Sequence, residues 1–234
     1  MGDSNAPSLT AIMARRLAHA LRTPVGVVDG VLSELGRSDA IVTDPTLDSF
    51  ATLGRRSLRQ LLEVATRLDW VARSERVASE AVMALSWPEV LQRAVEDRTQ
   101  GRRERERKRL TLVIADDVGQ GRGHREPAER SVFELVDNAL RHAATLVEVI
   151  ADVDGPWLRV RVADDGPGLP HADATVFGPP QGSGPRLGIG LWLVDHLAKA
   201  MQGNVVVDRT GPGGTVMCLR VPLMADPVEH ASAQ

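Results

Sequence analysis

The 234-residue chain has no tyrosine, and aromatic residues make up only 3% of it, so a core must be built from leucine, valine, alanine and isoleucine. It has one cysteine, Cys218, which excludes a disulfide framework within the chain and favours a reducing compartment. No apolar run reaches the roughly 18 residues of a membrane span. Residues 1–9 also lack the basic and apolar regions of a signal peptide. We therefore expect a cytoplasmic protein without membrane insertion.

The chain also lacks a strong excess of charge. Its net charge is −3, which favours neither nucleic acid nor an anionic membrane as a partner. One basic stretch, RRERERKR at residues 102–109, contains no aromatic side chain that could stack on bases. We interpret this stretch as a solvated helix end and linker, and we predict no nucleic-acid partner.

Residues 8–75 show helical periodicity and almost no strand signal. We predict two helices of about 28 residues each joined by a short loop, with Asp44 capping the second helix and Pro45 in its first turn. Such a hairpin leaves one apolar stripe open, and a second copy would close it into a four-helix bundle. On the first helix the apolar positions are Leu9, Met13, Leu17, Ala20, Leu21, Val28, Val31 and Leu35.

From about residue 80 helices and strands alternate, which predicts an α/β sandwich of one sheet and several helices. Asp154-Gly155 is a hairpin turn between the two central strands. We interpret VGQGRG at 118–123 as a linker loop, and the domains as 1–79, 80–225 and a disordered tail, 226–234. The predicted strands are 110–115, 146–153, 157–164, 204–208 and 215–221, and the predicted helices begin near Ser86, Glu126 and Gly190.

Three segments of the second region carry residues suited to binding a nucleotide. In ELVDNALRHA (134–143) a carboxylate, an amide and a cation share one helix face and could hold Mg²⁺ with phosphate, although a solvated face has the same pattern. VADDGPGLP (162–170) ends a strand in two aspartates and a glycine turn, which is also typical of a simple acidic loop. In GSGPRLGIGLWLV (182–194), glycines lead into a helix start, where free amides bind phosphate. Each pattern alone is weak.

Together, in this order, the three segments resemble the catalytic ATP-binding domain of sensor histidine kinases, within the GHKL superfamily that includes gyrase and Hsp90-type chaperones. They are similar to the N, G1 and G2 boxes of that domain, VFGPP (176–180) is similar to a trimmed F box, and GGTVMCLRVPL to its closing strands. RRLAHALRTP (15–24) resembles the H box of the dimerisation and phosphotransfer domain. The resemblance covers residues 8–223. It implies a helical hairpin that dimerises, followed by a GHKL-type α/β sandwich.

The resemblance also implies a function and a set of site residues. A homodimer would bind Mg²⁺–ATP, phosphorylate itself and pass the phosphoryl group to an aspartate of a response regulator, under the control of an upstream sensor. His19 would accept the phosphoryl group, and Thr23 would orient water for phosphatase activity. Asn138 and Glu134 would bind Mg²⁺, and Asp164 would bind the adenine amine. The remaining nucleotide-binding residues are Arg141, His142, Gly166, Gly168, Gly188, Gly190, Leu191 and Thr215.

The surroundings of His19 agree with this role on geometry alone. Arg15, Arg22 and Thr23 share its helix face opposite the apolar stripe, so the imidazole should face solvent and be free to attack phosphorus. Pro24 should bend the helix just beyond it.

The sequence departs from the family pattern at three positions. Ala20 follows the histidine where the family usually has a carboxylate that helps to deprotonate it. Glu134 stands where histidine kinases commonly have Asn, and related ATPases use Glu there to activate water. Arg186 stands where the G2 box often has Gly. These departures keep other hypotheses open: a phosphotransfer protein with a degenerate ATP domain, a pseudokinase scaffold that binds a response regulator, and an anti-sigma-factor type of serine kinase, which the hairpin disfavours.

Overall fold

The computed structural model describes residues 8–37, 44–77, 79–99, 108–169, 174–179 and 188–223. The chain divides into two compact units, Met1–Glu75 and Arg76–Gln234, and each is described by itself. The predicted tail at 226–234, the G2-box residues Gly182, Gly184 and Arg186, and most of the basic stretch lie outside the described residues. Within the described ranges, no helix combines the length and the apolar character needed to cross a membrane.

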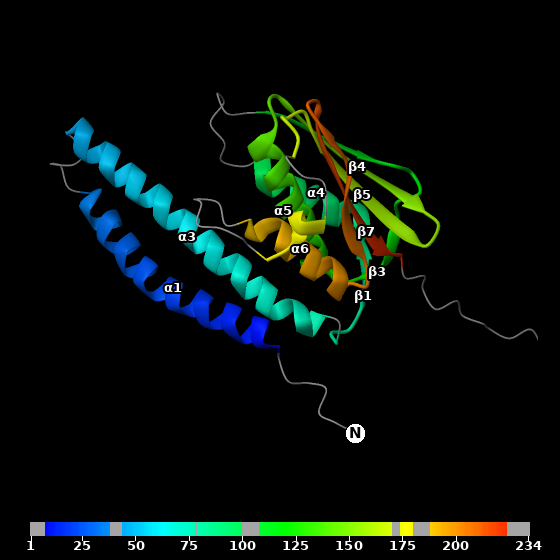
Figure 1. The fold of residues 1–234 in the computed structure, drawn as a ribbon, viewed down its shortest axis with the longest axis horizontal. Coiled ribbons are helices and arrows are strands. Elements are labelled where there is room, and N and C mark those ends of the chain that lie inside the picture. Colours follow the sequence, from blue (N-terminus) through cyan, green and yellow to red (C-terminus); the bar gives the residue numbers. More distant parts are fainter. Residues whose placement is uncertain are drawn as a thin grey trace, which may run out of the picture. The chain divides into compact units, whose positions relative to one another are not determined.

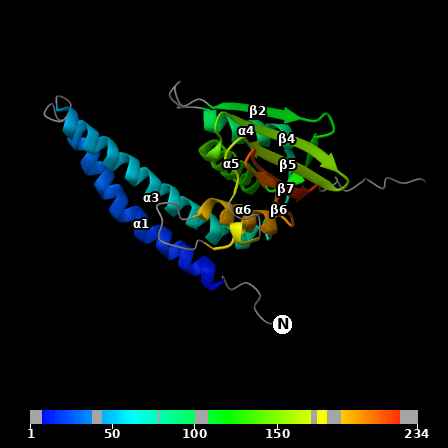
Figure 2. The same ribbon diagram turned by 45° about the horizontal axis from the view of Figure 1, so that its top comes forward.

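The first unit is the predicted helical hairpin. Helix α1 spans Leu9–Leu35 and helix α3 spans Pro45–Val77, and the two run side by side in both views (Figures 1 and 2). Pro24 lies inside α1, which continues through it. Asp44 caps α3 as predicted, since its Oδ1 accepts hydrogen bonds from the amides of Thr46 and Leu47 at 2.8 and 3.3 Å.

The seam between the two helices is built largely from small side chains, which the apolar periodicity did not reveal. Gly54 of α3 allows a close approach, because a Cβ there would lie 2.9 Å from Cδ1 of Leu32 on α1. Arg22 of α1 and Asp69 of α3 form an ion pair between the two helices, with Nη2 and Oδ2 3.1 Å apart. The buried apolar residues of this unit include Ala11, Ala14, Ala18 and Val25 on α1 and Ala51, Leu58 and Ala65 on α3.

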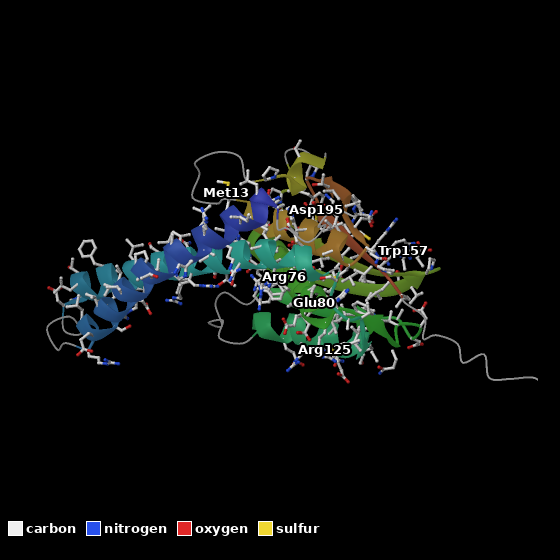
Figure 3. All side chains as sticks on the ribbon, turned by 90° about the horizontal axis from the view of Figure 1, so that it is seen from below. Met13, Arg76, Glu80, Arg125, Trp157 and Asp195 are labelled. Carbon is white, nitrogen blue, oxygen red and sulfur yellow. The ribbon has the colours of Figure 1, made fainter. Side chains whose placement is uncertain are left out.

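The large apolar side chains of the predicted stripe lie on another side of α1 and are exposed within the single chain. Met13 is 54% exposed, Leu17 52% and Val31 54%. Figure 3 shows side chains projecting along both helices, Met13 among them. The hairpin therefore buries alanines in its own seam and leaves the larger residues uncovered. We call this exposed surface the apolar stripe; its members on α1 are Leu9, Met13, Leu17, Val28, Val31 and Leu35.

The second unit is a sandwich of a five-stranded sheet and a layer of helices. The strand order is β2-β4-β5-β7-β6; β2 and β4 are parallel and the other neighbours are antiparallel. Figure 2 shows α4, α5 and α6 on one face of this sheet. The strands are β2 Arg109–Ile114, β4 Leu146–Asp154, β5 Trp157–Asp164, β6 Asn204–Gly211 and β7 Gly214–Pro222; the helices are α4 Trp87–Thr99, α5 Arg125–His142, α6 Ile189–Ala200 and the 3₁₀ helix η2 Ala174–Phe177.

The core lies between the helices and the inward face of the sheet. Strand residues alternate between buried and partly exposed, as expected of a sheet with one covered face. The fully or almost fully buried residues include Val147, Val149 and Ala151 of β4, Leu158, Val160 and Val162 of β5, Leu135 and Val136 of α5, and Leu193 and Leu197 of α6.

A small second sheet was not predicted. β1 (Met83–Ser86) pairs antiparallel with β3 (Gln120–Gly123), so the interpretation of residues 118–123 as a linker loop is wrong. Trp87 explains the glycines of β3, because a Cβ on Gly121 would lie 2.8 Å from Nε1 of Trp87 and one on Gly123 would lie 3.2 Å from its Cζ2. The buried indole therefore packs against bare backbone, and this tertiary contact has no periodic signature in the sequence.

Candidate functional site

Helix α5 carries the first group of predicted site residues. Its apolar side is buried in the core, and the side chain of Glu134 is almost as buried, at 1% exposure. The carboxylate of Glu134 forms an ion pair with Arg130 one turn earlier, and the Arg130 guanidinium also lies over the ring of Phe133. Asn138 is half-buried on the next turn. The helix therefore presents an amide at Asn138, while Glu134 is engaged with a cation of its own helix.

The C-terminal turn of α5 holds Arg141 and His142 at the surface. Arg141 is paired with Asp137, with Nη2 and Oδ2 2.5 Å apart, and the Asp137 side chain is only 9% exposed. A buried carboxylate thus orients the guanidinium that was predicted to approach phosphate. Asp137 is not among the site residues predicted from the sequence, although its position one turn before an arginine is a detectable i,i+4 pattern.

The end of strand β5 brings together the predicted residues Asp164 and Thr215. The β5–β7 register places them opposite one another. Asp164 Oδ1 accepts a hydrogen bond from the Gly166 amide at 2.9 Å, and no partner of Oδ2 occurs among the described residues. Thr215 is buried, 3.2 Å from the hydroxyl of Thr210, which in turn accepts from the Leu169 amide at 2.7 Å. One oxygen of Asp164 is therefore available to a ligand. Thr210, which was not predicted as a site residue, holds the loop after β5 through its hydrogen bond with Leu169.

The adjacent aspartate has a different environment. Asp165 accepts hydrogen bonds from the hydroxyl of Thr145 at 2.6 Å and from the amides of Thr145 and Leu146 at 2.9 and 3.0 Å. These bonds, led by the one from the Thr145 hydroxyl, hold the pKa of Asp165 well below its usual value of 3.8. The carboxylate of Asp165 thus connects the loop after β5 to the start of β4, and we assign it a structural role.

The glycines of this loop let two other segments approach it. A Cβ on Gly166 would lie 2.5 Å from the carbonyl oxygen of His142, so the loop abuts the end of α5. Gly168 has φ +83, and a Cβ there would lie 2.8 Å from the carbonyl carbon of Gly211 in the β6–β7 turn. Residues 164–169 are therefore enclosed by the end of α5 on one side and the β6–β7 turn on the other.

Helix α6 supplies the remaining predicted residues. Gly188 has φ +60 and occupies the N-cap position, and the helix begins at Ile189, which is buried. Gly190 and Leu191 lie half-buried in the first turn, and that turn has no acidic side chain. No carboxylate of this turn neutralises the positive end of the helix dipole. The free amides at the start of α6 are therefore suited to binding an anion.

The first unit presents His19 as the sequence predicted. His19 is exposed on α1 next to Ala18, which is completely buried in the seam. Thr23 is exposed one turn further on, and between them Arg22 reaches Asp69 of α3. The imidazole therefore lies on a helix that is packed against α3 along another face, and His19 itself is exposed to solvent.

The described residues contain no group of three or more His, Cys, Asp or Glu side chains that could hold a metal ion. Mg²⁺ does not require such a group, because it is commonly bound through one or two protein oxygens, substrate phosphates and water. Asn138 can supply one such oxygen, whereas Glu134 would first have to leave Arg130.

Known proteins resemble both units. Residues 123–225 match the family of histidine kinase-, DNA gyrase B- and HSP90-like ATPases. The sensor protein TorS of Escherichia coli (strain K12) is 35% identical over 121 residues, covering 49% of this chain and 13% of TorS. The E. coli sensor protein CreC is 28% identical over 218 residues, covering 88% of this chain and 44% of CreC.

Solved structures share the fold of both units. ShkA, crystallised full-length in complex with AMPPNP, superposes with a TM-score of 0.74 at 23% identity, covering 93% of this chain and 47% of that one. The Acinetobacter baumannii histidine kinase AdeS gives a TM-score of 0.59 at 18% identity, covering 88% and 98%. Residues 123–225 therefore form an ATPase domain of the histidine kinase-, DNA gyrase B- and HSP90-like family, and the chain as a whole is similar to sensor histidine kinases. The chain spans less than half the length of TorS and of CreC.

Proposed function

We propose that this chain is a histidine kinase, which binds Mg²⁺–ATP in its second unit, phosphorylates His19 and passes the phosphoryl group to an aspartate of a response regulator. The observation that carries the proposal is that one chain has both a solvent-facing histidine on a packed helix and an aspartate, Asp164, whose Oδ2 has no hydrogen-bond partner among the described residues. The match of residues 123–225 to the ATPase family, and the AMPPNP complex of ShkA, whose fold is similar, support nucleotide binding by the second unit.

Each part of the nucleotide has a partner in the second unit. Oδ2 of Asp164 would accept a hydrogen bond from the exocyclic amine of adenine, and Thr215 lies opposite Asp164 on β7. Asn138 contributes an oxygen to Mg²⁺, which neutralises phosphate charge when bound. Arg141, steered by Asp137, and the amides of the first turn of α6 at Gly188 face the phosphates.

The chemical steps are two phosphoryl transfers. A ring nitrogen of His19 attacks the γ-phosphorus of ATP, the bond to the bridging oxygen breaks, ADP leaves, and the displaced ring proton passes to a base or to water. A carboxylate oxygen of the regulator then attacks phosphorus and the P–N bond breaks, which returns neutral histidine once the ring is reprotonated. We assign Thr23 to the reverse task of orienting water against the phosphorylated regulator, because it lies one turn from His19 on the same face.

Ala20 cannot be the base in the first step, because alanine has no group that accepts a proton. Glu134 is the candidate that the second unit offers. Its carboxylate is buried against Arg130, so it acts as a base only after this ion pair opens.

We further propose that the chain is a homodimer through residues 8–75. The apolar stripe exposes leucine, methionine and valine side chains to water along the length of α1. A second copy that covers the stripe completes a four-helix bundle, and it places His19 beside the interface without covering it.

A relay protein or a kinase-dead scaffold is the second candidate, favoured by Ala20 and by the engagement of Glu134 with Arg130. Calorimetry with a non-hydrolysable ATP analogue, followed by incubation with labelled ATP, separates the two. The kinase predicts tight binding and label on wild type, and none on His19→Gln. Asp164→Asn should lose binding while its circular dichroism spectrum is unchanged. Bound nucleotide without label on wild type would reject the kinase and leave the relay or scaffold.

A further inference from the structure

The exposed face of α1 around His19 is unusually rich in arginine. Arg15 and Arg16 precede the histidine by four and three residues, and Arg22 follows it by three, so all three lie within one helical turn of it. Residues 9–28 of the helix contain no acidic side chain. The histidine therefore stands in a local field of three positive charges with no compensating carboxylate on its own stretch of helix.

These three arginines are not equivalent in the structure. Arg22 is committed to Asp69 of α3 at 3.1 Å and helps to close the hairpin seam. Arg15 and Arg16 are exposed, and within the described ranges neither makes a hydrogen bond or an ion pair. Two guanidinium groups are therefore free to bind an anion without first breaking an existing contact.

The spacing places these two groups beside the histidine, because residues three and four apart are neighbours on a helix surface. Side chains on a helix lean towards its N-terminus, so the imidazole of His19 leans over the turn that carries Arg15 and Arg16. A phosphoryl group on the ring adds three strong acceptor oxygens at its far end. The planar fork of arginine matches such oxygens with paired hydrogen bonds.

We propose that Arg15 and Arg16 form a phosphoryl-binding pair, which holds the phosphoryl group on His19 and slows its loss to water. The physical reason is differential binding. Loss to water passes through a loose, metaphosphate-like transition state, and cations that bind the dianionic ground state more strongly raise the barrier. This inference rests on the proposed function only in that His19 is the residue that carries the phosphoryl group.

The experiment loads the histidine without ATP. Phosphoramidate transfers its phosphoryl group to a ring nitrogen of the full-length chain; its own P–N bond breaks and ammonia leaves. The decay of phosphohistidine is then followed by ³¹P NMR in wild type, in the double variant Arg15→Gln/Arg16→Gln and in the control Arg56→Gln. Arg56 is an exposed arginine on α3 that, in the described part of the chain, also has no partner.

We expect the phosphohistidine of the double variant to decay about threefold to tenfold faster than that of wild type, the scale of two exposed charge-assisted contacts. Arg56→Gln should decay like wild type, and Arg15→Lys/Arg16→Lys should recover most of the lifetime because the charge is kept. Added salt should shorten the wild-type lifetime and barely change that of the double variant, a response that a purely structural role would not produce.

Equal lifetimes in wild type and the double variant would overturn the proposal. Equal lifetimes with slower transfer to a receiver domain would overturn it too, and would assign the two arginines to recognition of an acidic partner. Failure of phosphoramidate to load His19 in wild type would also reject it. Loading that succeeds while ATP gives no label would reject only the kinase proposal, so the two failures are distinguishable.

Discussion

Replacing Gly214 by alanine tests how closely the β6–β7 turn approaches the candidate nucleotide site. Gly214 is buried with φ +113, and a Cβ there would overlap the carbonyl oxygen of Asp164 and lie 2.8 Å from its carbonyl carbon. The obstacle is backbone rather than a flexible side chain. Alanine must therefore push β7 away from the end of β5, where Asp164 leaves the sheet.

The substitution should lower the free energy of unfolding for two reasons. A left-handed backbone costs an L-residue about 1–2 kcal/mol, and forcing strained backbone into a packed site costs about 1–3 kcal/mol more. Together these give about 2–5 kcal/mol, and at about 3 °C per kcal/mol for a domain of this size the midpoint of thermal unfolding should fall by about 6–15 °C. Nucleotide affinity should fall as well, because Asp164 moves.

Two other glycines are matched controls. Gly155 has φ +59 but open space around it, so Gly155→Ala carries only the left-handed cost of about 1–2 kcal/mol. Gly213 has open space around it and no positive φ. Gly213→Ala should therefore leave the free energy of unfolding unchanged or raise it by up to about 1 kcal/mol. Thermal unfolding by circular dichroism ranks the three variants, and calorimetry measures their nucleotide affinity. If Gly214→Ala loses no more stability than Gly155→Ala, the close approach of β7 to Asp164 is wrong.

Four further outcomes are expected. Asp165→Asn should lower the midpoint of thermal unfolding at neutral pH. Because the pKa of Asp165 is depressed in the folded state, the contribution of its carboxylate to the free energy of unfolding is complete above about pH 4 and is lost on further acidification. The stability of the variant should therefore depend less on pH below about 4 than that of wild type. Leu17→Glu, on the apolar stripe, should give monomers by sedimentation, and a dimer that persists would argue against the stripe as the interface. Thr23→Ala should keep labelling of His19 and slow dephosphorylation of the regulator; unchanged phosphatase activity would remove Thr23 from that role. Ala20→Glu should speed labelling about tenfold or more if a missing base limits the reaction; if it does nothing while Glu134→Gln abolishes labelling, the second unit supplies the base.

The sequence was a good guide where local patterns decide structure. The helix start at Asp44-Pro45 and the hairpin turn at Asp154-Gly155 are local signals, and the structure contains both. It was a poor guide to β1 and β3. Strand β3 is four residues with two glycines, so it shows no alternation, and it becomes a strand because Trp87 packs against its bare backbone.

The candidate site shows the same limit. The glycines and aspartates of the loop after β5 could be read from the sequence, but the division of labour between Asp164 and Asp165 could not. The two carboxylates are neighbours of the same residue type, and only the position of Thr145, twenty residues earlier in the chain, makes one of them a structural anchor. The ion pairs Arg130–Glu134 and Asp137–Arg141 follow a local i,i+4 rule, yet their burial depends on the packed core around α5.

The position of Ala20 follows from the three sides of helix α1. One side is the alanine seam against α3, a second is the apolar stripe, and His19 stands on the polar face between them. At about 100° per residue, Ala20 is rotated from His19 onto the side of Met13 and Leu17, the side that a second copy would cover. A carboxylate at this position would be partly desolvated when the stripe is covered, which is costly unless the carboxylate is paired with the imidazole of His19. A small apolar residue therefore suits the interface, and the chemistry at His19 must take its base from elsewhere.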